Sequence, residues 1–179
     1  VKLIRKEKFQ FKQIAKSFVE FVNGLDVDNK KKIIFAAFPN PASDKGYMKR
    51  IINSYKIPNL TQKEIQSYFG FKCREERRKK FNGYLQEYCK LYKINYINVD
   101  KELFNKDQSN ILEKYIVPDD YNIHLLWEYQ LELMTKKLSK FGFKTFNPNG
   151  KDTRNYIKKL KREGKLKKDI LDELLFNIK

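Results

Sequence analysis

The feature that most constrains the fold is a run of apolar residues, Ile33 to Phe38, closed by Pro39-Asn40-Pro41. A continuous apolar run of this length is typical of a strand buried on both faces of a parallel sheet. A helical pattern over residues 8–23 precedes it and ends at Asn23-Gly24. This order predicts an α/β fold, which we expect to be a three-layer α/β/α arrangement with a mostly parallel sheet.

Further elements follow from the periodicity of apolar residues and from capping patterns. The sequence predicts helices at residues 61–70, 74–92 and 123–141 and strands at residues 94–100 and 143–146. Positive charge at the start of the 74–92 helix opposes the helix dipole, so an acidic group must offset it, either Glu75 and Glu76 or a partner. Asp100 ends its strand at the edge where α/β sheets place their chemistry. The residues expected in the core are Phe35, Phe81, Leu85, Ile97, Trp127 and Leu131.

The composition changes after Asn147-Pro148-Asn149-Gly150, where two polar helices are predicted at residues 152–163 and 166–177. Residues 151–179 hold ten Lys or Arg and five Asp or Glu. We therefore expect an α/β domain over residues 1–146 and a basic helical tail over residues 147–179.

The apolar pattern excludes a membrane-spanning protein, because a span needs roughly 20 consecutive apolar residues. The sequence has two cysteines, Cys73 and Cys89, too few for a disulfide framework. On one helix they would lie about 24 Å apart. We expect reduced thiols in an intracellular, cytoplasmic protein.

The net charge of +17 predicts a polyanion partner such as nucleic acid. An AT-rich coding sequence would also enrich lysine, and only seven of the 39 basic residues are arginine, the residue that bidentate phosphate contacts favour. Both explanations stay open. A second basic stretch lies at residues 151–168, and the candidate polyanion-binding residues are Lys30, Lys31, Lys32, Arg74, Arg77, Arg78, Lys79 and Lys80.

His124 is the one histidine of the chain, and it follows a loop that contains Asp119 and Asp120. We expect it in the first turn of the 123–141 helix. A histidine held by a carboxylate can act as a general base towards a hydroxyl nucleophile. A lone histidine is also compatible with an ordinary surface side chain, and residue type alone does not separate these interpretations.

The order of motifs from about Phe9 to Phe141 resembles the C-terminal half of the SGNH/GDSL hydrolase family. The motifs are a strand with a proline-rich loop at residues 32–41, a helix with a basic start and an asparagine at residues 77–82, a strand at residues 94–99, and an Asp/His block at residues 119–125.

The resemblance implies a serine-type esterase without a cofactor, acting on an acylated small molecule or glycan, carbohydrate deacylation included. His124 would be the general base, Asp120 its orienting carboxylate and Asp119 the reserve. The family's aspartate usually lies three residues before the histidine, where this chain has Tyr121. The loop would therefore have to be longer here.

The sequence holds no Gly-Asp-Ser block and no Gly-x-Asn-Asp block, which supply the family's nucleophile and oxyanion-hole residues. Because the chain begins at Val1, we expect a fragment whose nucleophile lies on a longer polypeptide or on a partner chain. A fold that has lost catalysis, leaving a basic binding module, is the alternative.

Pro118-Asp119 followed by Glu128-Tyr129-Gln130 also loosely resembles the metal-binding carboxylates of PD-(D/E)XK nucleases. Against this interpretation, Gln130 replaces the usual lysine, and Glu128 falls on a predicted helix where that motif needs a strand. The sequence contains no zinc-ligand spacing, phosphate-binding loop or dinucleotide-binding glycine pattern. It therefore implies no metal or nucleotide cofactor.

Overall fold

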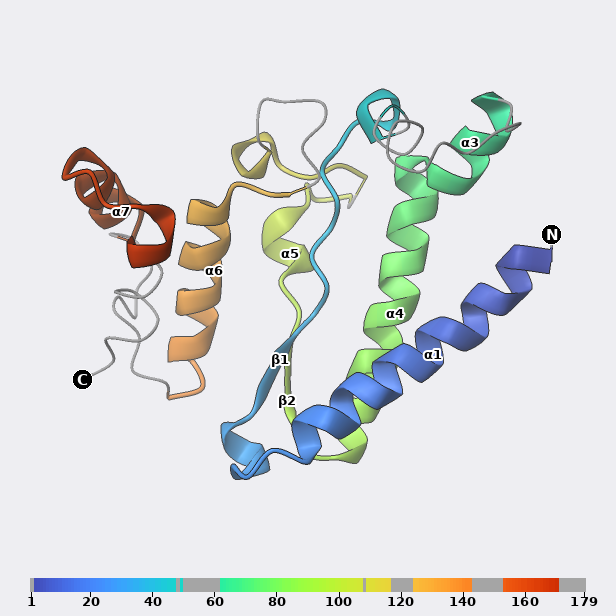
Figure 1. The fold of residues 1–179 in the computed structure, drawn as a ribbon, viewed down its shortest axis with the longest axis horizontal. Coiled ribbons are helices and arrows are strands. Elements are labelled where there is room, and N and C mark those ends of the chain that lie inside the picture. Colours follow the sequence, from blue (N-terminus) through green and yellow to red (C-terminus); the bar gives the residue numbers. More distant parts are fainter. Residues whose placement is uncertain are drawn as a thin grey trace. The chain divides into compact units, whose positions relative to one another are not determined.

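The computed structural model describes residues 2–47, 49, 62–107, 109–116, 124–142 and 153–170. These residues are mostly helical (Figure 1) and divide into two compact units. The first unit lies within residues 2–111, and the second contains residues 112–116 together with residues from 124 onwards. Each unit is described below by itself.

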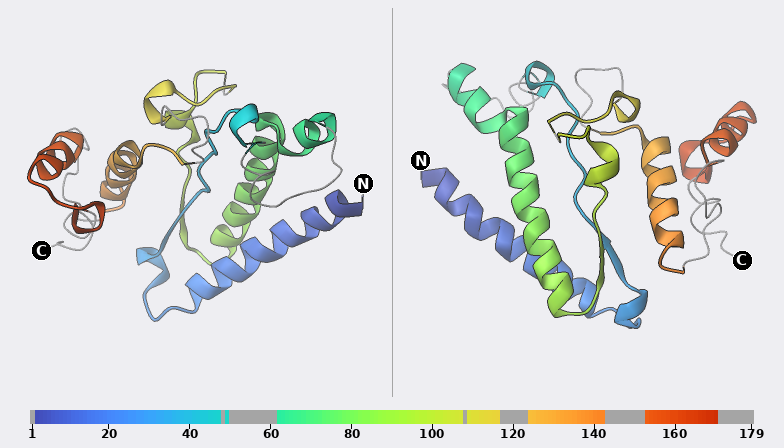
Figure 2. Two further views of the ribbon diagram at one scale, coloured as in Figure 1. Left: turned by 45° about the horizontal axis from the view of Figure 1, so that its top comes forward. Right: turned by 180° about the vertical axis from the view of Figure 1, so that it is seen from behind.

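The first unit contains one parallel pair of short strands with helices packed against it. The pair joins β1 to β2 and places Ile33 opposite Asn95 and Phe35 opposite Ile97. Figures 1 and 2 show α1 crossing the later turns of α4, and α4 running beside the strands. The elements are α1 (Lys2–Asn23), η1 (Asn29–Lys31), β1 (Ile33–Phe35), α3 (Gln62–Phe69), α4 (Phe71–Leu91), β2 (Asn95–Ile97) and α5 (Asp100–Leu103).

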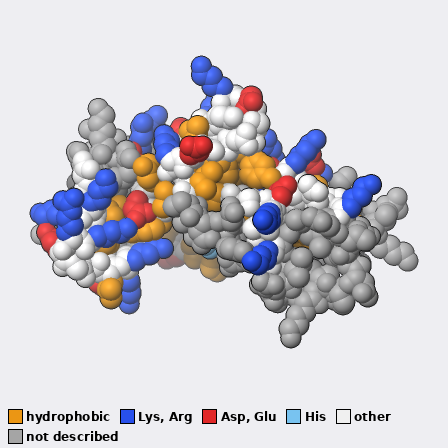
Figure 3. Space-filling view, turned by 90° about the horizontal axis from the view of Figure 1, so that it is seen from above, with side chains coloured by type: hydrophobic (Ala, Val, Ile, Leu, Met, Phe, Trp, Pro, Cys, Tyr) orange, Lys and Arg blue, Asp and Glu red, His pale blue; other side chains and the backbone are white. Residues whose placement is uncertain are grey.

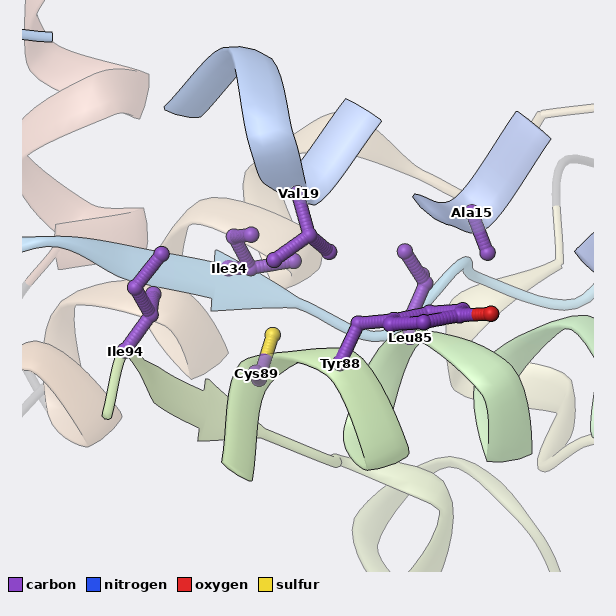
Figure 4. Packing of buried hydrophobic residues seen from close by; sticks show 7 residues of the cluster. All are labelled: Ala15, Val19, Ile34, Leu85, Tyr88, Cys89 and Ile94. Atoms are coloured by element: carbon purple, nitrogen blue, oxygen red, sulfur yellow. The ribbon is translucent and has the colours of Figure 1, made fainter. Parts of the chain in front are cut away.

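The core of the first unit forms where α1, α4 and the start of the strands meet (Figure 4). Ala15 and Val19 of α1 lie against the later part of α4, which contributes Leu85, Tyr88 and Cys89. These small α1 side chains allow the two helices to approach closely. The predicted core residues Leu85 and Ile97 are buried, whereas Phe35 and Phe81 are only partly buried.

The apolar surface of α1 is wider than the face that it buries. Ile14, Phe18 and Phe21 are each between 46% and 67% exposed, although they follow the same helical periodicity as Ala15 and Val19. A hydrophobic pattern therefore locates this helix correctly, but it does not identify which of its apolar residues reach the core.

The second unit is built around two helices whose apolar faces meet. Leu131, Ile157, Leu160 and Ile170 form its buried cluster, and Trp127 packs against that cluster while it stays partly exposed. An antiparallel bridge joins Ile116 to Leu125. The elements are η2 (Glu113–Tyr115), α6 (Trp127–Ser139), α7 (Thr153–Arg162) and a helical segment at residues 167–170.

Two glycines in this unit adopt a left-handed backbone conformation. Gly142 follows α6 and Gly164 follows α7, each with φ of 78°. This conformation is unfavourable for residues with a Cβ, so glycine is suited to end both helices. The helix predicted at residues 123–141 begins later, at Trp127, and ends at Ser139, three residues before Gly142.

The sheet is smaller than the sequence suggested. A three-layer sandwich is not seen among the described residues, where the pair β1–β2 is the whole sheet. β1 ends at Phe35 although the apolar run continues to Phe38, because the backbone of Ala37 bonds to a side chain of α4 instead of a neighbouring strand. The predicted strand at residues 143–146 and the predicted boundary at residues 146/147 lie outside the described residues.

A search of the described helices found none that is both long and apolar enough to cross a membrane. Both cysteines lie on α4 as unpaired thiols, with Cys89 buried and Cys73 partly exposed. Burial raises the pKa of the Cys89 thiol to about 11, because the thiolate loses its hydration there.

Candidate functional site

A cluster of buried and partly buried polar side chains lies where the chain leaves the carboxyl ends of β1 and β2. We call it the polar cluster. Its members come from the segment after β1, from α4 and from the start of α5, so three segments distant in sequence meet there. The members are Asp44, Arg74, Glu75, Arg78, Asn82 and Asp100.

Asn82 binds the backbone on both sides of Ala37. The Asn82 Oδ1 accepts a hydrogen bond from the Ala37 amide at 2.7 Å, and the Asn82 Nδ2 donates to the Ala37 carbonyl at 3.1 Å. One side chain thus satisfies the donor and the acceptor that a neighbouring strand would otherwise pair. This arrangement fixes the chain two residues before the Pro39-Asn40-Pro41 loop.

Arg78 is the centre of the polar cluster and is only 8% exposed. Its Nη1 donates to Asp100 Oδ1 at 2.7 Å and to the Ala37 carbonyl at 3.0 Å, and its Nε donates to Glu75 Oε2 at 2.8 Å. The guanidinium also lies over the ring of Phe104. One cation therefore connects β1's exit loop, α4 and the start of α5.

Arg74 holds the other end of the proline-rich loop. Its guanidinium donates to the carbonyls of Ala42 and Phe69 and lies 4.3 Å from the ring centre of Tyr47. Asn40 Oδ1 accepts from the Ala42 amide at 3.0 Å, which closes a tight turn inside the loop. Residues 37–42 are therefore fixed to α4 at both ends.

The acidic group that the basic start of α4 requires is supplied within the first unit. Asp44 Oδ1 accepts from the Phe71 amide at the first turn of α4 and forms an ion pair with Arg74 at 3.4 Å. Glu75 pairs with Arg78 at 2.7 Å. A carboxylate at a helix N-terminus also stabilises the helix dipole.

The two arginines differ in electrostatic environment. Burial lowers the pKa of Arg74, because the attraction of Asp44 offsets only part of the lost hydration. Burial also acts to lower the pKa of Arg78, but its hydrogen bonds to Asp100 and Glu75 outweigh that effect and raise the pKa overall. Arg78 is thus the better compensated of the two buried cations.

The polar cluster holds backbone segments in place through hydrogen bonds to carbonyls and amides. Its carboxylates are bound to arginines or to a backbone amide, and its arginines donate to carbonyls and carboxylates. A search of the described residues found no group of three or more His, Cys, Asp or Glu that could hold a metal ion. The arrangement can present residues 37–42 as a rigid loop at the carboxyl edge of the strands.

The eight candidate polyanion-binding residues fall into two groups. Lys32 is buried, and its Nζ donates to the Asn23 and Leu25 carbonyls and to Asn29 Oδ1, each at 2.8 Å. With Arg74 and Arg78 it belongs to the interior, so these three side chains are assigned a structural role. Arg77 is partly exposed, whereas Lys30, Lys31, Lys79 and Lys80 are exposed.

His124 lies three residues before α6 rather than in its first turn, because the helix begins at Trp127. The histidine is exposed and has an interaction partner within the structure. Asp119 and Asp120 lie outside the described residues, so their pairing with His124 stays a prediction. Glu128 lies on α6, and its carboxylate forms an ion pair with Lys161.

Sequence reasoning missed the polar cluster, although a signal for it was present. Arg74, Arg78, Asn82, Leu85 and Cys89 are spaced by three or four residues and form one buried row along α4. The sequence predicts burial for the apolar end of this row through Leu85, whereas it predicts polyanion binding for Arg74 and Arg78 at the charged end.

Comparison of the chain with family models, with curated protein sequences and with solved structures found no match.

Proposed function

We propose that the chain is the part of an SGNH/GDSL-like ester hydrolase that carries the acid–base pair. One observation supports this proposal above all others. The motifs on which the resemblance rests, namely the proline-rich loop, the helix with its basic start and asparagine, and the second strand, meet in the polar cluster through Ala37, Arg78, Asn82 and Asp100. Their order in the sequence thus corresponds to physical contact.

In this proposal His124 acts as the general base and Asp120 orients it, with Asp119 as the reserve. The imidazole takes the proton of a serine hydroxyl as the serine attacks the ester carbonyl, and then returns the proton to the departing alcohol. Water releases the acyl group from serine in a second round. The exposure of His124 supports access by a substrate.

The serine and the oxyanion-hole residues would come from a longer polypeptide or from a partner chain, since this sequence has neither block. The complete fold would then be the three-layer α/β/α arrangement with a mostly parallel sheet. We propose an acylated small molecule or glycan as the substrate and the cell interior as the location, in keeping with two unpaired thiols.

The test is hydrolysis of a short acyl ester by the protein expressed from its native reading frame, together with any chain that copurifies with it. His124→Ala should lower kcat by about 10³-fold or more while the circular dichroism spectrum stays unchanged. Lys136→Ala, an exposed substitution on α6, is the control and should have no effect.

Asp120→Asn and Asp119→Asn, assayed side by side, identify the orienting carboxylate. The larger loss of kcat should follow Asp120→Asn. Turnover retained by His124→Ala would remove this mechanism, and absence of hydrolysis in the native protein would leave a binding module without catalysis.

A further inference from the structure

The helices at the end of the second unit present a dense basic surface that the hydrolase proposal does not use. Residues 153–168 contain eight Lys or Arg and one Glu. Seven of these basic side chains are exposed, and we call them the α7 basic face. They are Lys158, Lys159, Lys161, Arg162, Lys165, Lys167 and Lys168. Figure 3 shows Lys and Arg side chains gathered at left, over these helices.

The acidic side chains nearby leave most of this charge uncompensated. Glu128 pairs with Lys161, and Glu163 lies 3.8 Å from Lys159. The carboxylate of Asp169 accepts a hydrogen bond from the Leu166 amide at 3.2 Å. Within the described part of the chain, Lys158, Arg162 and Lys168 form no ion pair. The face therefore carries a concentrated positive charge on a helical framework.

The apolar side of α7 is already used inside the protein. Ile157 and Leu160 are at most 3% exposed and pack with Leu131 and Ile170. An amphipathic helix that binds a lipid surface must bury its apolar side among acyl chains. Because α7 buries that side in the protein core, only Leu166 of residues 155–170 offers a large exposed apolar side chain, and we favour a partner bound by charge alone.

The aromatic residues of this unit are also engaged. The amines of Lys161 and Lys167 lie 5.0 and 5.4 Å from the ring centre of Trp127, and Tyr156 packs against the core. Neither ring forms an open platform for stacking on a base. Lysine dominates the face, and lysine binds phosphate as a point charge rather than through the bidentate geometry of arginine.

We propose that the α7 basic face binds the phosphate backbone of nucleic acid without reading its sequence. The partner fits because closely spaced phosphates complement a row of exposed cations, and release of their counterions drives binding. The proposal does not depend on the hydrolase activity, since it uses neither His124 nor the polar cluster.

The experiment measures fluorescence anisotropy of a labelled, mixed-sequence DNA duplex of about 20 base pairs with the full chain, over roughly 0.05 to 0.2 M salt. The wild-type chain should lose affinity steeply as salt rises. A triple variant, Lys158→Gln, Arg162→Gln and Lys168→Gln, should bind about 100-fold more weakly at 0.1 M salt and reduce the salt slope by about 2.7.

The matched control removes three exposed lysines on or directly after α4 through Lys72→Gln, Lys90→Gln and Lys93→Gln, and should change affinity only a few-fold. A second duplex of scrambled sequence should bind equally well. The proposal is overturned if the α7 triple variant binds DNA like the wild type, if the α4 control loses as much affinity, or if vesicles containing phosphatidylserine are bound and DNA is not.

Discussion

The two halves of α4 bury the same face of the helix by opposite chemistry. Its later half presents Leu85 and Cys89 to an apolar core formed with Ala15, Val19 and strand residues. Its first half presents Arg78 and other charged or amide groups to carboxylates and backbone carbonyls. The apolar half gains stability by removing hydrocarbon from water, whereas the polar half must offset its lost hydration with hydrogen bonds and ion pairs.

Because of this difference in chemistry, the two halves of α4 fix different parts of the structure. Apolar packing tolerates changes of shape at a modest cost and fixes α1 against α4. The polar half is sensitive to the loss of a single partner, because the remaining charge stays buried, and it fixes residues 37–42 at an atomic level. The comparison predicts different responses to substitution in the two halves.

The largest effect is expected at Arg78. Arg78→Ala should lower the free energy of unfolding by about 4 kcal/mol, because Glu75 and Asp100 would lose their shared cation while staying largely buried. Urea denaturation measures this change. Lys80→Ala, an exposed position on the same helix, is the control and should shift stability by no more than about 0.5 kcal/mol.

A second Arg78 variant tests whether the unpaired carboxylates cause the loss. Arg78→Met combined with Glu75→Gln and Asp100→Asn should recover a substantial part of the stability, since no buried charge is then left alone. A triple variant as unstable as Arg78→Ala would show that lost packing, rather than charge, explains the effect.

In the apolar half, Leu85→Ala should lower the free energy of unfolding by about 3 kcal/mol, because the burial of the side chain is lost and a cavity is left in the α1–α4 core. Leu85→Met should cost less than about 1.5 kcal/mol, because a flexible side chain of similar volume refills the space. Equal losses for the two variants would contradict the view that this half tolerates changes of shape.

Asn82→Ala should lower the free energy of unfolding by about 2 kcal/mol, because both hydrogen bonds from this side chain to Ala37 are lost. Asn82→Asp keeps the acceptor for the Ala37 amide but sets a carboxylate against the Ala37 carbonyl, so it should not rescue stability. Thermal unfolding followed by circular dichroism measures the stability of both variants. An Asn82→Asp protein as stable as the wild type would show that the bond from Asn82 Nδ2 to the Ala37 carbonyl contributes little to stability.

The smallest effect concerns alkaline pH. The pKa of Cys89 is raised to about 11 from an ordinary value of 9.0, so its contribution to stability is complete below pH 9 and is lost as pH rises towards 11. The loss should be about 1.4 kcal/mol at pH 10. Cys89→Ala should abolish this part of the pH dependence, while Cys73→Ala should keep it; identical profiles for all three proteins would contradict the assignment.

Sequence alone predicts helices α1, α3, α4, α6 and α7 and the strand pair from the spacing of apolar residues and from capping patterns. It does not predict α5, whose first residue, Asp100, was expected to end a strand. It did not give the extent of the sheet, since an asparagine side chain ends β1 by binding Ala37. It also misplaced Arg74, Arg78 and Lys32, because composition treats a basic residue as exposed unless a partner is known. Their partners, Asp44 and Asp100 among them, are distant in sequence and become visible only once the chain has folded.

Hydrogen exchange at the Ala37 amide tests most directly whether the polar half of α4 fixes the proline-rich loop. In the wild-type protein this amide should be protected like that of Ala36, which donates to Ile97 in the strand pair. Asn82→Ala should speed exchange at Ala37 by about 100-fold or more and leave Ala36 protected. Unchanged protection of Ala37 in that variant would contradict the account.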